Sequence, residues 1–253
     1  MILLLYLGGD IISRLSLKII ALITMIIDHI GSLLFPEITI LRIIGRLAFP
    51  LYCFLLVDGY EHIKNDKKRL AKYAINLLLF AIISEVPFNL MQNHTCSYIL
   101  HQNVLFELFV GLLMLIGVDF AKDNRLLKTI FVYLASIFAF ALFFDYSFFG
   151  VLLILGLYYY RKSDKNSILY ISFLIFIILF IVYDLLATYT PDVSNYWANS
   201  LAEDIYLIGV PFAIPLILSY NGAQGKHNRF IKYFFYFSYP LHIIILLFIE
   251  KII

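Results

Sequence analysis

The chain has 253 residues, of which 62% are hydrophobic and 14% are charged, and its formal net charge is +2. Soluble domains contain about 25% charged and about 45–50% apolar residues, so this composition excludes an ordinary soluble protein. The mean hydropathy of +0.91 indicates a polytopic integral membrane protein. We therefore expect the lipid bilayer as a partner and expect no nucleic acid.

Apolar segments separated by short loops predict an all-α helix bundle in a single domain over residues 1–253. In chain order, about nine transmembrane helices are predicted at residues 16–35, 38–60, 70–92, 103–120, 126–143, 148–160, 167–189, 201–219 and 232–250. The sixth is short for a hydrocarbon core that needs about 20 helical residues, so it is either re-entrant or joined to its neighbour. The apolar N-terminal segment has no basic leader and no small-residue cleavage site, so we expect no removable signal peptide.

The basic residues predict the orientation of the bundle. Sixteen of the nineteen Lys and Arg residues fall in alternate loops, two more lie inside a span, and Lys251 alone falls on the opposite side. Cytoplasmic loops carry an excess of Lys and Arg. This pattern predicts a multi-pass protein of the cytoplasmic cell membrane, with its N-terminus inside and its C-terminus outside.

Four ionisable residues interrupt the first two predicted helices: Asp28, His29, Arg42 and Arg46. A charged side chain at the centre of a membrane helix costs about 2.5–3.5 kcal/mol on insertion scales. Arg42 and Arg46 are four residues apart and share a helix face. Pro50 has no N–H, which leaves the Arg46 carbonyl without its helical partner and predicts a kink.

Further polar residues are predicted at a similar depth in later helices. They are Ser84 and Glu85 before Pro87, Asn103 and Glu107 at the start of the fourth helix, and Tyr236, Tyr239 and His242 around Pro240. Asp58 and His62, toward the cytoplasmic end of the second helix, are expected to form an interfacial pair. The six histidines are scattered without ligand spacing, so no metal is expected.

Two interpretations of these polar residues stay open. Arg42 and Arg46 either pair with Asp28 and Glu85 to lock helices together, or they form a working site. The aromatic residues, including Tyr158–Tyr160, are expected to contact lipid or form an interfacial belt.

The residue types favour acyl transfer. A buried histidine beside a carboxylate is a common general-base arrangement. Adjacent helical residues point about 100° apart, so Asp28 need not contact His29, and Glu85 and Glu107 are the alternative partners. Two arginines in a membrane cavity suit a phosphate or carboxylate group. The same inventory fits a proton-coupled small-solute transporter, in which carboxylates and histidine relay protons.

Five segments resemble the TraX family of integral membrane proteins: LKIIALITMIIDHIGSLLFP, LRIIGRLAFPLYCFLLVDGYEHIKN, AIISEVPFNL, NVLFELFVGLLML and YNGAQGKHNRFIKYFFYFSYPLHIIIL. The similarity runs in matching order from about Leu17 to the C-terminus and includes FDYSFFGVLLILGLYYYR. The combination of DHIG, LRIIGRLAFP and YPLH is specific. The family's named member acetylates the N-terminus of conjugative pilin with acetyl-CoA, and the family is distantly similar to membrane acyltransferases that modify sugars.

The resemblance implies an acyl-CoA-dependent membrane acetyltransferase with acetyl-CoA as the acyl-donor substrate. The matching motif positions are Asp28, His29, Arg42, Arg46, Asp58, Glu85, Asn103, Tyr239 and His242. Our own assignment makes His29 the general base, with Asp28, Arg46 and Glu85 as the other catalytic residues. The residues assigned to acyl-CoA binding are Arg42, Arg46, Asn103, Tyr239 and His242.

The acceptor is left open by the sequence. An amine or hydroxyl of a pilin-like peptide or of a glycan fits the resemblance equally well. Glu107 departs from the family pattern, in which a small polar residue follows NVLF, and it adds a carboxylate that could alter acceptor choice. A transporter, for which no internal repeat is visible, and a non-enzymatic assembly factor for surface structures are the alternatives.

Overall fold

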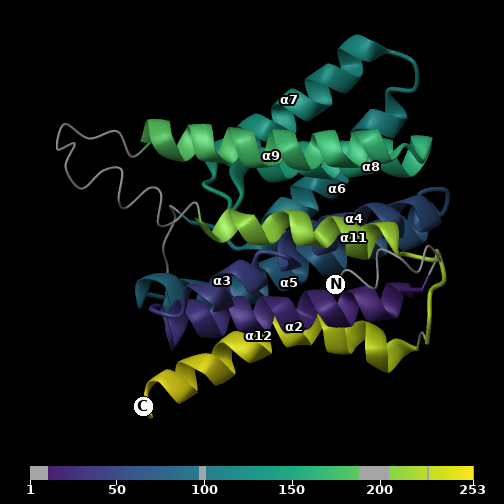
Figure 1. Cartoon of the computed structure of the whole chain (residues 1–253). Helices are drawn as coiled ribbons and strands as arrows, with labels where there is room; N and C mark the ends of the chain where they lie inside the picture. The colour runs from purple at the N-terminus through teal and green to yellow at the C-terminus, as the bar shows by residue number, and fades with distance from the viewer. Residues whose placement is uncertain (1–10, 97–100, 188–204, 227, 253) are drawn as a thin grey trace. The chain divides into compact units, whose positions relative to one another are not determined.

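The computed structural model of the chain describes residues 11–96, 101–187, 205–226 and 228–252 (Figure 1). These residues form helices and no strand, apart from two isolated bridges that join Ile12 to Tyr220 and Gln102 to Phe144. The all-α prediction is confirmed over this part of the chain.

Five of the described helical segments are long and apolar enough to cross a membrane, as expected of a membrane protein. They lie in α2 (Arg14–Leu33), in α3 (Thr39–Gly45) together with α4 (Ala48–Ile63), in α5 (Lys67–Asn93), in α9 (Asn166–Ala187) and in α12 (Arg229–Glu250). The helices α6 (Val104–Phe120), α7 (Arg125–Ala141) and α8 (Ser147–Ser163) have 17 residues each. The 3₁₀ helix η1 (Ile205–Phe212) and α11 (Ala213–Leu218) are shorter still.

The second predicted helix is interrupted where its sequence contains a proline. α3 ends at Gly45 and α4 begins at Ala48, with a turn at residues 46–47 between them. Pro50 lies in the first turn of α4 and cannot donate to the Arg46 carbonyl. The interruption therefore falls one turn before the proline, as a break between two helices.

The predicted helix at 201–219 begins at residue 205 in the described part of the chain, and residues 201–204 lie outside it. Its first half is the 3₁₀ helix η1, which contains Pro211, and its second half is α11. Proline removes a donor from the α-helical ladder, which favours the tighter 3₁₀ geometry at this point.

Polar residues just before several helices define where those helices begin. The side chain of each accepts a hydrogen bond from a backbone N–H in the first turn, at 3.0–3.2 Å. These residues are Ser13 for α2, Asp66 for α5, Asn103 for α6 and Asn124 for α7.

Two compact units make up the chain, and the boundary between them falls inside α4 and near the start of α9. Unit 1 contains residues 1–52 and 169–228, and in it α3 packs against α2 and η1. Unit 2 contains residues 53–168 and 229–253. In unit 2, α6 packs against α5, α7 and α8, and α12 packs against α5 (Figure 1). A single domain over residues 1–253 stays a prediction.

Glycines allow the helices of unit 1 to approach one another closely. A Cβ at Gly45 would lie 2.2 Å from the Cβ of Asp28, and a Cβ at Gly209 would lie 1.8 Å from the backbone oxygen of Ile43. A Cβ at Gly31 would also lie 2.7 Å from a side chain of α3. The spacing of α2, α3 and η1 therefore depends on these three positions.

We expect Gly209→Ala to destabilise the protein, because the new methyl group overlaps a backbone carbonyl that cannot rotate away. The thermal unfolding midpoint in detergent should fall by about 5 °C or more, as overpacking by one carbon in a tight contact predicts. Gly111→Ala is the matched control, since its added carbon meets only the terminal methyl of Ile154, which can turn aside. Equal midpoints for the two variants would contradict the close packing of η1 against α3.

Candidate functional site

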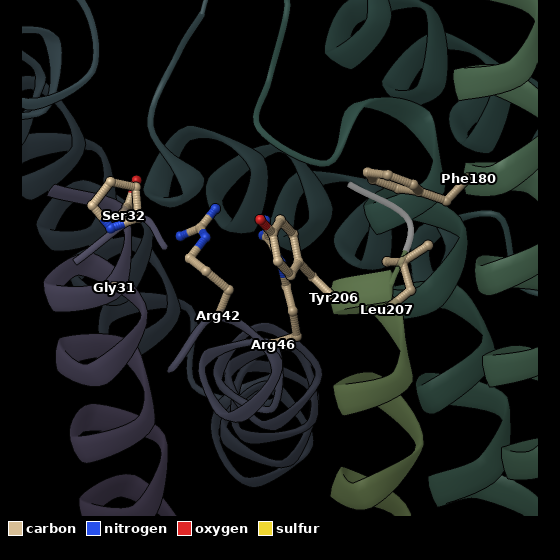
Figure 2. Close-up of a pocket in the computed structure, with 8 residues that line it drawn as sticks. Gly31, Ser32, Arg42, Arg46, Phe180, Tyr206 and Leu207 are labelled. Atoms are coloured by element: carbon tan, nitrogen blue, oxygen red, sulfur yellow. The ribbon is translucent and has the colours of Figure 1, made fainter. Parts of the chain in front are cut away.

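Unit 1 contains a polar cavity of about 300 Å³ (Figure 2). This volume lies at the lower end of the range of about 300–1,000 Å³ found for small-molecule sites. The cavity is lined by Gly31, Ser32, Pro36, Arg42, Arg46, Phe180, Tyr206 and Leu207. Two of the sequence-predicted site residues, Arg42 and Arg46, thus lie in one cavity.

An ion pair joins α3 to α2 beside this cavity. The Nη1 atom of Arg42 lies 2.7 Å from Oδ2 of Asp28 and also donates to the backbone oxygen of Asp28 at 3.2 Å. The two side chains are only 17% and 14% exposed. The ring of Tyr206, with its centroid 5.6 Å from the guanidinium carbon of Arg42, adds a cation–π contact from η1. Arg42 is therefore held on two sides and neutralised by Asp28.

Arg46 brings a second guanidinium group to the same cavity. It is the C-terminal cap residue of α3, directly after Gly45, and its backbone N–H donates to the Arg42 carbonyl at 3.1 Å. Figure 2 shows the Arg42 and Arg46 side chains pointing in the same direction. Asp28, Arg42 and Arg46 together carry a formal charge of +1. This arrangement suits one carboxylate, phosphate or developing oxyanion.

His29 is buried on α2, with 8% of its surface exposed. Adjacent helical residues point about 100° apart, so His29 and Asp28 belong to different faces of α2. Ser32, four residues after Asp28, lines the cavity, whereas His29 is not among the described residues that line it. The structure brings Asp28, Arg42 and Arg46 together and puts His29 on a neighbouring face of the same helix.

Glu85 and Asn103, predicted as members of one site, are in contact in unit 2. The Nδ2 atom of Asn103 donates to Oε2 of Glu85 and to the Ala81 carbonyl, and Oδ1 of Asn103 caps α6. The other Glu85 oxygen accepts from Asn89 Nδ2 at 3.3 Å. Glu85 and Asn89 line a second cavity, of about 550 Å³. Asn103 therefore positions a carboxylate as well as a helix start.

Tyr239 and His242 are both buried on α12, and their ring centroids lie 5.7 Å apart in an edge-on contact. His242 Nδ1 lies 2.7 Å from the Ser238 carbonyl, which can only accept, so the ring nitrogen donates. In the neutral ring the lone pair then lies on Nε2. These two sequence-predicted site residues are therefore in contact with each other, within unit 2.

Two other carboxylates in unit 2 have partners that tie elements together. Glu107 is fully buried, and its Oε2 atom accepts the Tyr146 N–H at 2.8 Å. Asp58 is also fully buried and lies 3.0 Å from Nη2 of Arg161, whereas His62 Nδ1 is 3.7 Å from its carboxylate. The Asp58–His62 contact is present, but Arg161 is the closer ionic partner.

The expectation that Tyr158–Tyr160 form an interfacial belt is wrong for Tyr158, which is fully buried, and for Tyr160, which is buried as well. The hydroxyl of Tyr158 takes part in a network of hydrogen bonds. This hydroxyl donates to Asp119, which also accepts from the hydroxyl of Tyr60 at 2.8 Å and from Lys162 Nζ at 2.8 Å. This network joins α4, α6 and α8. Tyr158 and Lys162 are four residues apart and so share a helix face. This spacing is the sequence feature that could have indicated the network around Asp119.

His101, in the segment before α6, forms an ion pair with Asp145, whose Oδ1 atom lies 3.1 Å from Nε2. Burial alone would lower the pKa of His101, but the hydrogen bond and charge of Asp145, together with the charge of Glu85, raise it. Among the residues that the structure describes, no group of three His, Cys, Asp or Glu side chains could hold a metal ion.

Comparison with known proteins gives one family match and two relatives. The family model described as TraX protein matches residues 13–250. A probable fimbrial assembly protein, FimC of serogroup H1, from Dichelobacter nodosus is 29% identical over 248 residues, which cover 92% of this chain and 94% of that protein. An uncharacterized protein of Rickettsia prowazekii (strain Madrid E) is 38% identical over 95 residues, which cover 38% of this chain and 33% of that protein. No solved structure matches.

We expect Asp28→Ala to destabilise the protein strongly, because it leaves the Arg42 guanidinium in a partly buried position without its carboxylate. Removing one partner of such a pair should lower the free energy of unfolding by about 3 kcal/mol, measured by thermal or denaturant unfolding in detergent. Glu37→Ala, which removes an exposed carboxylate from the same unit, is the control. The double variant Asp28→Ala/Arg42→Met should recover part of the loss. A loss no larger than that of Glu37→Ala would contradict a stabilising pair.

Proposed function

We propose that this chain, which belongs to the TraX family, is a membrane-embedded acetyltransferase that uses acetyl-CoA as its acyl donor. The acceptor is an amine or hydroxyl of a peptide or glycan. The observation that carries the proposal is a family match over residues 13–250 that includes a cavity with two arginines. A relative of similar length is named as a fimbrial assembly protein, which favours a pilin-like surface peptide as acceptor.

The proposed reaction needs a base and a positive charge at the carbonyl oxygen. His29 would accept the proton of the acceptor nitrogen or oxygen as that atom attacks the thioester carbonyl. Arg46 would stabilise the developing oxyanion. The attack forms a C–N or C–O bond, and the C–S bond of the thioester then breaks. The CoA thiolate that leaves takes up the proton that His29 accepted.

Asp28 and Arg42 would support this chemistry from the side of the cavity. The 2.7 Å ion pair fixes the Arg42 guanidinium, so that Arg42 shapes the cavity and Arg46 meets the substrate. The roles assigned to Glu85, Asn103, Tyr239 and His242 in catalysis or acyl-CoA binding stay predictions.

We expect His29→Gln and Arg46→Gln each to lower acetyl transfer by about 100-fold or more, which is typical for loss of a general base or an oxyanion donor. The measurement is transfer or hydrolysis of labelled acetyl-CoA by protein purified into nanodiscs. His62→Gln is the matched histidine control, because His62 is half-exposed at the end of α4. Unfolding midpoints equal to that of the unaltered protein show that the variants fold.

Full activity in both variants would contradict the site assignment. An unaltered protein that binds no acetyl-CoA at millimolar concentration would contradict the enzyme and favour the transporter.

We also propose nine membrane crossings in the cytoplasmic membrane with the N-terminus in the cytoplasm. The basic residues of alternate loops support this orientation. The helices α6, α7 and α8, with 17 residues each, would each extend about 26 Å, close to the hydrocarbon thickness of about 30 Å.

A reporter enzyme that is active only outside the cytoplasm tests this topology. Fused after Asp123, between α6 and α7, it should be inactive, and fused after Asp145, between α7 and α8, it should be active. The same activity at both points would contradict a crossing by α7.

A further inference from the structure

The larger cavity, in unit 2, has a polar end and an apolar end. Its polar lining residues come from the C-terminal part of α5 and the segment before α6: Glu85, Asn89, Cys96 and Gln102. Its apolar lining extends along α5, α6 and α7 and includes Leu78, Val110 and Phe138. Leu78 and Asn89 are 11 residues apart on α5, which corresponds to about 16 Å along the helix. A cavity of about 550 Å³ with this polarity has the form of a site for an amphiphile.

The polar end offers acceptors and a negative charge. Glu85 is a carboxylate, and no Lys, Arg or His is found among the described residues that line the cavity. Asn89 is only 2% exposed, and its Oδ1 atom accepts no hydrogen bond from the described residues. A buried acceptor without a donor is costly, and a ligand N–H would remove that cost. Both groups therefore favour a positively charged donor.

Neighbouring charges do not cancel the charge of Glu85. The nearby imidazole of His101 is paired with Asp145 at 3.1 Å, so that these two contribute no net positive charge. Asn89 and Asn103, which donate to Glu85, are neutral. Glu107, one turn after Asn103 on α6, is a second carboxyl group in this region, and it accepts a hydrogen bond from the Tyr146 N–H.

Aromatic rings line the cavity beside its polar residues, since Phe144 is bridged to Gln102 and contacts Phe106 and Phe138. Four phenylalanines line the cavity: Phe106, Phe109, Phe138 and Phe144. Aromatic faces attract ammonium groups as well as alkyl chains. Among the lining residues, Val86 is 49% and Phe138 is 51% exposed, and we take these two as the mouth of the cavity. In a membrane such side chains face lipid, so a ligand can enter from the bilayer.

We propose that this cavity binds an amphiphile with an ammonium head, held by Glu85 and Asn89, and an apolar tail that lies along α5 and α6. The shared chemistry is the ammonium group, which a single-chain amine or the headgroup of a diacyl lipid can supply. The proposal does not depend on the unit 1 cavity, and it gives Glu85 a binding role in place of the catalytic role predicted from the sequence.

Cys96 is the reporter for the test, because it lines the cavity and is exposed, whereas Cys53 is fully buried. The protein is reconstituted in phosphatidylglycerol vesicles, and the rate at which a neutral maleimide alkylates Cys96 is measured. Decylammonium should slow this reaction in a saturable way, whereas decanol and decanoate at equal membrane concentration should not. Equal protection by decanol or decanoate would overturn the proposal.

Glu85→Gln removes the charge and keeps the shape. It should require at least about tenfold more decylammonium for the same protection, as the loss of a charge-assisted hydrogen bond predicts. Glu37→Gln, which alters an exposed carboxylate of unit 1, should leave the protection unchanged. Protection that is unchanged in Glu85→Gln would overturn the proposal.

Val86→Trp obstructs the mouth at a half-exposed position that tolerates a larger side chain. It should abolish protection by decylammonium although Glu85 is present, and continued protection would mean that the amine binds elsewhere. Phosphatidylethanolamine added to the vesicles identifies the source of the ammonium group. Slower alkylation with this lipid supports a diacyl ligand, and protection by decylammonium alone supports a single-chain ligand.

Discussion

A guanidinium group inside an apolar helix needs a carboxylate within contact distance, and the arrangement of unit 1 follows from that need. Arg42 reaches both the side chain and the backbone of Asp28, which is possible only where α2 and α3 nearly touch. Gly45 faces Asp28 itself, and a side-chain carbon there would overlap the carboxylate. The ion pair and the glycines thus act together. The charge of Arg42 requires α2 and α3 to approach each other closely, and the missing Cβ atoms of the glycines permit that approach. Because Gly209 lets η1 approach α3 in the same way, Tyr206 contacts Arg42 and lines the cavity.

In unit 2, each of three buried or half-buried carboxylates forms a hydrogen bond or ion pair with a residue of another segment. Glu85 on α5 accepts from the residue that caps α6, Glu107 on α6 accepts from the backbone before α8, and Asp58 on α4 pairs with Arg161 on α8. In an apolar surrounding, an unsatisfied carboxylate is far more costly than in water. Each of these contacts therefore fixes the relative position of two elements more firmly than apolar packing alone, which tolerates sliding and rotation.

Hydropathy and proline placement predicted most of the fold, because helix length and interruption depend on local sequence. The interruption near Pro50 and the helix start at Asn103 are of this kind, whereas α5 begins at Lys67, three residues before the predicted start at 70. Pairing between helices depends on how each helix is rotated about its axis, and apolar residues on every face leave that rotation undetermined. The sequence therefore left Asp28, Glu85 and Glu107 as candidates for the partner of His29. It also could not distinguish the buried Tyr158 from the more exposed Tyr159. Nothing in the sequence indicated that Tyr206 and Asn89 line cavities. The role of a single polar residue in an apolar segment depends on which residues pack against it.

The structural and functional interpretations of the paired arginines are compatible. If Arg42 and Arg46 both lacked a carboxylate, two positive charges would share one small cavity and repel each other. Asp28 removes one of these charges and leaves a cluster with a formal charge of +1, so the stabilising contact also sets the charge that a ligand meets. In unit 2 the sign is reversed, since the carboxyl group of Glu85 accepts hydrogen bonds from the neutral amides of Asn89 and Asn103. The rule is the same in both units: the charge that neighbouring side chains leave uncancelled determines which ligand can replace water in the cavity. By that rule we expect the unit 2 cavity, where Glu85 and Asn89 present oxygen acceptors, to favour a cationic group, and we propose an anionic group for the unit 1 cavity, which two arginines line.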